Sequence, residues 1–372
     1  MKTGRTLVEL AAEIERQATT AQDYLAATDA VEMVVAGEKG LQLALASGTD
    51  KEVRLDMREL AHEQLSGYLD IPRKYYDRMR GSQPELLAHN VNTWMREQRD
   101  RKGGTDVRMI RTLDGSVRAV LSNSYRCMNN ADLAEAVFPV LAQMELEVLS
   151  CEITERRLYI KAVDKRITVD CPTGKRMGDA SHTFFDTVSP AIVVSNSEVG
   201  CGALSVETAI WTKVCTNMAI ASQRSMRKYH LGSRADLGEE VMAVLSDRTR
   251  AVTDAALWLQ VRDVTAAAFD RAKLEAYVNE TLVPAVEAKI EGDPVKAVEL
   301  IAKKIGINDT ERGGVLRHLI EGGDLSQYGM HAAVTRLAED LPDYDRATEF
   351  ERLGTRVLEL PRGEWQVVAK AA

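Results

Sequence analysis

Alternating segments in the middle of the chain limit its fold more than any other feature. Residues 107–111 and 117–121 alternate in polarity on either side of Asp114-Gly115, and an Asp-Gly pair in this setting is the strongest short signal of a β-hairpin. A second pair of segments, VLSCEI and RLYIKAV, flanks an expected turn at residues 154–156. The centre of the chain is therefore predicted to contain antiparallel β-hairpins.

Helices are expected around these hairpins. A helix is predicted from Asn130 to about Met144, with Asn129 or Asn130 as its cap, and apolar residues keep helical spacing at both ends of the chain. This order of elements favours an α+β fold with an antiparallel, hairpin-rich central sheet. We expect a helical N-terminal region at residues 1–100, an α+β core with basic clusters at 101–234, and a helical C-terminal region at 235–372.

Composition narrows the class of protein. The chain has 372 residues, 45% of them hydrophobic and 28% charged, as is typical of a globular protein. No apolar run is long enough to span a bilayer and the first residues are charged, so we expect a cytoplasmic protein with no membrane partner. Five cysteines without a C-x-x-C pair argue against a disulfide framework or a compact zinc site.

Positive charge is concentrated in one segment of an acidic protein. Residues 206–234 hold five Lys or Arg against the single acid Glu207, whereas the whole chain has a formal net charge of −8. The alternation at residues 204–210 predicts a strand, and we expect a helix with a basic C-terminal end to follow it. Such a concentration of charge indicates an anionic ligand, although cations at a helix end also gain from the helix dipole.

Two arginines of the first hairpin form an unusual pair. With a two-residue turn at Asp114-Gly115, Arg111 would stand directly opposite Arg118, and like charges in opposed positions destabilise a sheet. Either both side chains extend into solvent, or an acidic side chain lies between them, or they face a phosphate backbone. Tyr125 and Arg126 follow the second strand and add the aromatic and cationic groups that single-stranded nucleic acid requires.

Motifs for common enzymatic chemistries are missing. The TGKR stretch at residues 173–176 lacks the glycine and the Ser/Thr of a phosphate-binding loop, and the Rossmann, zinc-protease and serine-hydrolase motifs are also absent. No cofactor is therefore expected, apart from Mg²⁺ in a divalent-metal nuclease that would use Asp186 and Glu198. A metal site assembled from Cys201, Cys215 and His182 is a further alternative to buried free thiols.

Three stretches resemble a known family. They are the block SNSEVGCGALSVETAIWTKVCTNMAIASQRSMRKYHLGSR, the segment LAHEQLSGYLDIPRKYYDRMRGSQPELLAHNVNTWM and the ending YGMHAAVTRLAEDLPDYDRATEFERLG. They carry the NS, VC-x-N, H-x-G, IP-x-x-Y and N-x-N-x-W elements of the phage/plasmid-like family known as domain of unknown function 932. Met218 departs from this pattern, because many relatives have glycine there.

The resemblance implies an accessory role in the DNA metabolism of phages. Hairpins, packed helices and basic clusters without an ATP site are also similar in outline to ATP-independent single-strand annealing proteins of the RecT, Redβ and Erf type. We therefore expect a single-stranded DNA-binding protein that promotes annealing in recombination or replication, acts as a homo-oligomeric ring or filament, and works with a phage exonuclease or a host single-strand-binding protein.

The residues assigned to this role are basic or aromatic. Trp211 or Tyr229 could add stacking. The alternatives are a host-directed interaction protein, such as an inhibitor of a bacterial defence system, and the nuclease described above. The residues predicted to bind nucleic acid are Arg111, Arg118, Tyr125, Arg126, Lys213, Arg224, Arg227, Lys228, His230 and Arg234.

Overall fold

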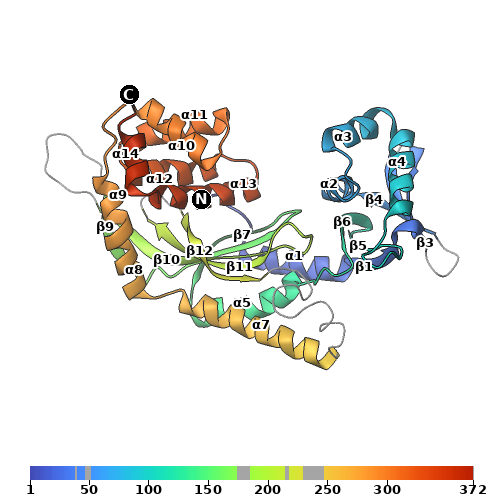
Figure 1. The fold of residues 1–372 in the computed structure, drawn as a ribbon. Coiled ribbons are helices and arrows are strands. Elements are labelled where there is room, and N and C mark those ends of the chain that lie inside the picture. Colours follow the sequence, from blue (N-terminus) through green and yellow to red (C-terminus); the bar gives the residue numbers. More distant parts are fainter. Residues whose placement is uncertain (38–39, 47–51, 174–184, 214–217, 229–246, 372) are drawn as a thin grey trace.

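The computed structural model has an α+β fold, which confirms the expected class, with two six-stranded sheets and helices packed against each (Figure 1). It describes residues 1–37, 40–46, 52–173, 185–213, 218–228 and 247–371. No helix in these ranges is long and apolar enough to cross a membrane.

The first sheet and three helices form an N-terminal unit, residues 22–122. Its strands lie in the order β1-β5-β6-β4-β3-β2, and all pairs are antiparallel except β4 with β6. The strands are β1 (Gln22–Ala27), β2 (Val31–Val35), β3 (Leu41–Ala46), β4 (Glu52–Met57), β5 (Val107–Leu113) and β6 (Ser116–Ser122), with a 3-10 turn η1 (Thr28–Ala30). The helices are α2 (Glu59–Tyr68), α3 (Arg73–Ser82) and α4 (Pro84–Glu97).

This unit differs from the expected division of the chain. Residues 22–57 form four strands rather than helices, and β5 and β6, from beyond residue 100, complete their sheet. Every second residue of β2 and β3 points to the same face of the sheet. On that face Val31, Met33, Leu43 and Leu45 are buried in one core cluster with helix residues such as Leu65. The core of the N-terminal unit therefore lies between this sheet and its helices.

The predicted hairpins are present in both sheets. Asp114 and Gly115 have φ angles of 53° and 72°, as a two-residue turn of the I′ type requires. However, Arg111 pairs with Ala119 and not with Arg118, because the register shifts next to Arg111 and leaves Arg118 as the extra residue of a β-bulge. The direct opposition of two arginines predicted from the sequence is therefore wrong.

The second sheet has the order β12-β11-β10-β8-β7, with β9 paired to the start of β10. The second predicted hairpin is confirmed as β7 and β8. The basic helix that was predicted to follow the strand at residues 204–210 is wrong for its described part, because Met218–Lys228 form β12, an antiparallel strand next to β11. The strands are β7 (Glu147–Ile153), β8 (Leu158–Val163), β9 (Val169–Pro172), β10 (Phe185–Asn196), β11 (Leu204–Thr212) and β12 (Met218–Lys228).

Helices cover both faces of the second sheet (Figure 1). On one face, α1 (Leu7–Thr20), α5 (Asn130–Gln143) and α7 (Asp247–Ala267) enclose a core that includes Ile14 and Ile192. On the other face, the C-terminal helices pack through α13 (Tyr344–Leu358), whose Tyr344 joins Val193 in a buried cluster. The alternation of β11 had predicted burial on one side only. Because both faces of the sheet are covered, β11 is instead buried on both sides.

The C-terminal helices have a core of their own around Phe350 and Val334. They follow α7 as α8 (Arg271–Tyr277), the π-turn η3 (Val278–Leu282), α9 (Val283–Glu287), α10 (Pro294–Ile305), α11 (Asp309–Gly322), α12 (Gln327–Arg336), η4 (Leu337–Glu339), α13 (Tyr344–Leu358) and α14 (Arg362–Ala369). The helical character expected after residue 235 is confirmed for the described part of this region. The N-terminal amine bonds Glu339 at 2.8 Å, so the start of the chain lies on these helices.

Candidate functional site at the junction of the two sheets

The loop between β10 and β11 joins the second sheet to the N-terminal unit. We call residues 197–203 the junction loop. Gln64 of α2 donates to the carbonyl of Val199 at 2.7 Å, and the hydroxyl of Tyr125 donates to the carbonyl of Ser197 at 2.8 Å. The backbone of this loop is therefore held by Gln64 of the N-terminal unit and by Tyr125, which follows β6.

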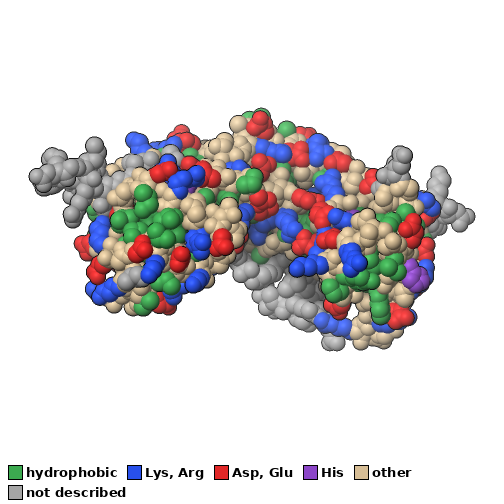
Figure 2. Space-filling view, turned by 90° about the horizontal axis from the view of Figure 1, so that it is seen from above, with side chains coloured by type: hydrophobic (Ala, Val, Ile, Leu, Met, Phe, Trp, Pro, Cys, Tyr) green, Lys and Arg blue, Asp and Glu red, His purple; other side chains and the backbone are tan. Residues whose placement is uncertain are grey.

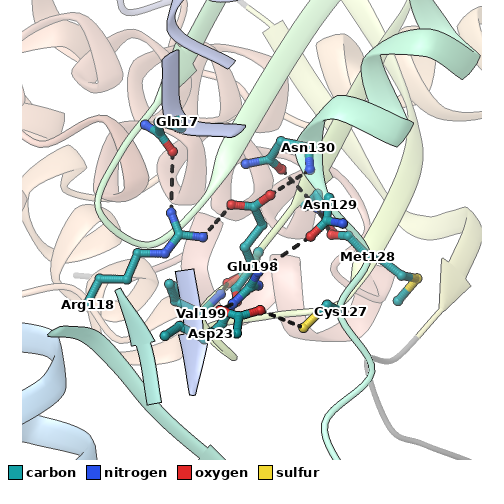
Figure 3. A network of polar contacts seen from close by, with 12 residues as sticks. Gln17, Asp23, Arg118, Cys127, Met128, Asn129, Asn130, Glu198 and Val199 are labelled. Carbon is teal, nitrogen blue, oxygen red and sulfur yellow. Dashed lines mark hydrogen bonds and ion pairs between the residues drawn. The ribbon is translucent and has the colours of Figure 1, made fainter. Parts of the chain in front are cut away.

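Glu198 is the centre of a polar network in this loop (Figure 3). Its carboxylate accepts from the guanidinium of Arg118 and, at 2.7 Å, from the backbone N–H of Asn130 at the start of α5. Its backbone carbonyl accepts from Nη1 of Arg111 at 2.7 Å, while Asp23 of β1 accepts from Nε of Arg111 at 2.8 Å. One loop residue thus connects β5, β6 and α5.

The network removes Arg111 and Arg118 from the surface. Their side chains are only 5% and 7% exposed. Burial lowers the pKa of Arg111, but its hydrogen bond to Asp23 and the nearby carboxylates outweigh this effect and raise the pKa overall, so the guanidinium stays charged. Of the three sequence-based alternatives, the acidic partner is the one observed, so neither arginine is exposed to a phosphate in this structure.

Tyr125 and Arg126 are also engaged. The Tyr125 hydroxyl accepts from the N–H of Gly200 at 3.3 Å in addition to its bond to Ser197, and burial raises the pKa of its phenol. Arg126 forms an ion pair with Asp254 of α7, and its side chain is 22% exposed. Tyr125 contacts the same loop as Arg111 and Arg118, and its ring is half-buried against the cluster that contains Val199.

The other predicted cations are divided between the two ends of the second sheet. Lys213 is exposed beyond the end of β11 that lies away from the junction loop, and its N–H bonds Thr187 at 2.9 Å. At the opposite end, Arg227 and Lys228 of β12 are in register with Ser205 and Leu204, and Arg224 is in register with Glu207. Among the described members of the set, Lys213 is therefore separated from the β12 cations, and His230 and Arg234 lie outside the described residues.

Arg156 and Arg157 lie at the same sheet end, in the turn between β7 and β8. Arg157 is largely buried and donates to Ser195 Oγ at 3.0 Å, and burial lowers its pKa. Arg156 is 44% exposed and pairs with Glu63 of α2. Sequence reasoning missed both arginines, although their place in a predicted hairpin turn was a usable signal, because turn residues lie at the ends of sheets.

Charged side chains of both signs meet in this region. Figure 2 shows Lys/Arg and Asp/Glu side chains together in the middle of the face seen from above, between the N-terminal unit and the C-terminal helices. Beneath the surface, Arg352 of α13 pairs with the buried carboxylate of Glu207 of β11 at 2.6 Å. The junction end of the second sheet therefore holds charged side chains of both signs, several of them in ion pairs.

The two carboxylates named for a nuclease do not meet. Asp186 is near the start of β10 and Glu198 is beyond its end, so about ten strand residues, or roughly 30 Å, separate them. Asp186 is buried beside the hydroxyl of Tyr328, and Glu198 is used in the junction network. No group of three metal-ligating side chains occurs among the described residues. Cys215 and His182 lie outside those residues, so the Cys201 alternative has no described geometry.

The expected stacking by Trp211 is wrong. Its side chain is buried in the cluster beneath α13, and the ammonium of Lys165 lies 4.6 Å from its ring centroid. Tyr229 lies outside the described residues.

No family model, no curated protein and no solved structure matches this chain. The resemblance to the phage/plasmid-like family therefore stays a prediction.

Proposed function

We propose that this protein binds single-stranded DNA without ATP and promotes strand annealing, as a phage- or plasmid-encoded protein in a bacterial cytoplasm. The observation that supports this proposal most directly is the composition of β12, an edge strand with three cations and no acid in a protein of net charge −8. Two of its cations, Arg227 and Lys228, lie at the junction end of the sheet. A run of cations without an acid attracts a polyanion through charge.

The set of residues assigned to phosphates changes accordingly. Arg111 and Arg118 are replaced by Arg156, which is exposed at the same sheet end. Its present partner Glu63 is 48% exposed, and a surface pair of this kind contributes only about 0–1 kcal/mol, so a phosphate can compete for the arginine. In this proposal, Arg156, Arg224, Arg227 and Lys228 neutralise the DNA backbone.

Salt dependence tests the proposal. Four contacts to a single strand predict that affinity for a labelled oligonucleotide falls about fifty-fold between 50 and 200 mM salt, from a slope of about −0.7 per contact. Replacing Arg227 and Lys228 with Gln lowers that slope by about 1.4. The matched control replaces the exposed Lys102 and Lys303, which lie away from this sheet end, and leaves the slope unchanged.

Annealing itself is measured with two complementary labelled strands and no ATP. Faster pairing with the protein than without it is expected, together with a ring or filament in light scattering. Failure to bind any oligonucleotide at 50 mM salt refutes the proposal.

One observation favours the host-directed interaction protein instead. Leu86 and Trp94 are 43% and 46% exposed and are eight residues apart on α4, which places them on one stripe of the helix. Exposed apolar residues of this size are typical of protein contact surfaces. Absence of oligonucleotide binding, together with a stable complex with a host protein that Trp94→Ala abolishes, would establish this alternative.

A further inference from the structure

A cavity of about 240 Å³ opens beside the junction network. It lies between α1, β1 and the start of α5, with Ile14 and Ile153 among its buried lining residues. Ala18 and Asn129 belong to its exposed rim, so solvent reaches it. The proposed function has not used this space, and none of its lining residues carries the phosphate contacts proposed above.

The size of the cavity limits what it holds. A volume of 240 Å³ corresponds to about eight water molecules at about 30 Å³ each, which is less than most drug-sized pockets occupy. One heterocyclic ring with part of a sugar fits this space. The lining combines apolar side chains with polar ones, as the faces and the edge of a nucleobase require.

The polar side of the cavity offers an acceptor. Oδ1 of Asp23 accepts from Arg111 at 2.8 Å, whereas Oδ2 accepts a weak bond from the thiol of Cys127 at 3.9 Å. The side chain of Asp23 is 36% exposed, so a ligand can reach the carboxylate. An ionised carboxylate only accepts hydrogen bonds, and a ligand at this position must therefore present an N–H or O–H group.

Asn129 adds an adaptable group to the same rim. Its amide makes two contacts at the limit of hydrogen-bond length, 3.5 Å to the guanidinium of Arg111 and 3.5 Å to Asp132. As the cap residue of α5 its side chain does not bond the helix backbone. An amide with one acceptor and two donors in such weak contacts can turn to complement the edge of a base.

We propose that this cavity binds one unpaired nucleobase of the DNA strand and prefers a base with an exocyclic amino group, such as cytosine, to thymine. The inference rests on the proposed single-strand binding. The amino group of cytosine donates to Asp23, and the ring lies against Ile14 and Ile153. Thymine presents a carbonyl at the same position, which leaves its own oxygen facing the Asp23 carboxylate without a hydrogen between them.

The test compares oligo-dC, oligo-dT and an abasic strand of equal length at pH 8. Their backbones are the same, so phosphate contacts cancel and the salt slopes should agree. We expect oligo-dC to bind about tenfold more tightly than oligo-dT. Asp23→Asn should make the two affinities equal, and a thermal unfolding curve checks that this variant remains folded.

A second variant fills the cavity without disturbing the network. Ala18→Leu should remove the preference for dC and leave abasic binding unchanged. Its control is Ala12→Leu on the same helix, which is exposed and does not line the cavity. Equal affinities of the natural protein for dC, dT and the abasic strand overturn the base pocket and leave strand binding intact.

Failure of strand binding is distinguished by free nucleosides. If no oligonucleotide binds, saturation-transfer NMR with cytidine and thymidine tests the cavity alone. Transfer to cytidine that Ala18→Leu abolishes supports the pocket without the proposed function, and absence of transfer to either nucleoside overturns it.

Discussion

Replacement of Glu198 by Gln tests whether the junction network holds the two sheets together. The side chains of Glu198 and Arg118 are 12% and 7% exposed, so water can hydrate neither group well after their ion pair is lost. Glutamine has one oxygen, so if this oxygen accepts from the N–H of Asn130, the amide NH2 donor faces the guanidinium of Arg118. Loss of one charge-assisted bond costs about 1.5–3 kcal/mol, and a buried charge left without its partner costs about 3–5 kcal/mol.

The expected cost lies between these limits. Arg118 retains a contact of 3.3 Å to Gln17, which compensates part of the loss. We therefore expect Glu198→Gln to lower the free energy of unfolding by about 3 kcal/mol. The matched control is Glu63→Gln, because Glu63 also pairs with an arginine but both side chains are nearly half exposed, and a cost of about 0–1 kcal/mol is expected.

Urea unfolding followed by both tryptophan fluorescence and circular dichroism measures these differences. Two probes are needed because a chain with two sheets need not unfold in one step. A double-mutant cycle with Arg118→Met then isolates the pair, and the coupling energy should exceed about 1.5 kcal/mol. Equal destabilisation by Glu198→Gln and Glu63→Gln would refute the argument from burial.

Three further predictions concern stability. Burial, with the nearby positive charge of Arg80 as a smaller cause, lowers the pKa of His62 from 6.5 to about 4. Folding therefore disfavours protonation of His62. The contribution of the neutral imidazole to the free energy of unfolding is complete above pH 6.5 and falls by up to about 3 kcal/mol between pH 6.5 and 4. Urea titrations at pH 6.5 and pH 4 measure the free energy of unfolding of the natural protein and of His62→Gln. The natural protein should show this loss, and His62→Gln should not. Lys161 and Glu351 are both fully buried and paired at 2.6 Å, so Lys161→Met alone should cost about 3–5 kcal/mol, whereas adding Glu351→Leu should restore most of it in the same assay. A Cβ at Gly329 would lie 1.7 Å from a backbone oxygen, so Gly329→Ala should lower the melting temperature, whereas Gly313→Ala, which meets no atom within 4 Å in α11, should raise stability by up to about 1 kcal/mol.

Local turn chemistry made part of the fold predictable. Asp114-Gly115 predicted the first hairpin because few residues other than Gly, Asn and Asp adopt positive φ angles easily, and both residues do so. The helix beginning at Asn130 was placed to the residue, and its end at Gln143 was placed to within one residue. These elements depend on neighbours in the sequence, which a single sequence displays directly.

The missed strands depend on distant partners. β3 has the sequence LQLALA, whose leucines alternate but whose Leu and Ala residues also suit a helix. β12 begins MAIASQR, which has the same ambiguity, and its basic end resembled a helix C-terminus. Pairing with β2 and β4 in one case and with β11 in the other determined the outcome, and tertiary pairing of this kind overrides weak local propensity.

The ion pairs of Arg111 and Arg118 explain why the residues proposed to bind DNA differ from those predicted from the sequence. The sequence showed that the positive charges of Arg111 and Arg118 needed an acidic partner. It could not show that Glu198, 80 residues after Arg118, pairs with Arg118. Nor could it show that Asp23, 88 residues before Arg111, pairs with Arg111. Once paired in this way, neither arginine can neutralise a DNA phosphate, and so release the counterions condensed on the DNA, without first breaking a buried ion pair. Such an exchange costs more than a surface phosphate contact returns. Cations that bind a polyanion must therefore come from exposed or weakly paired positions, and among the arginines at the junction Arg156 is such a position.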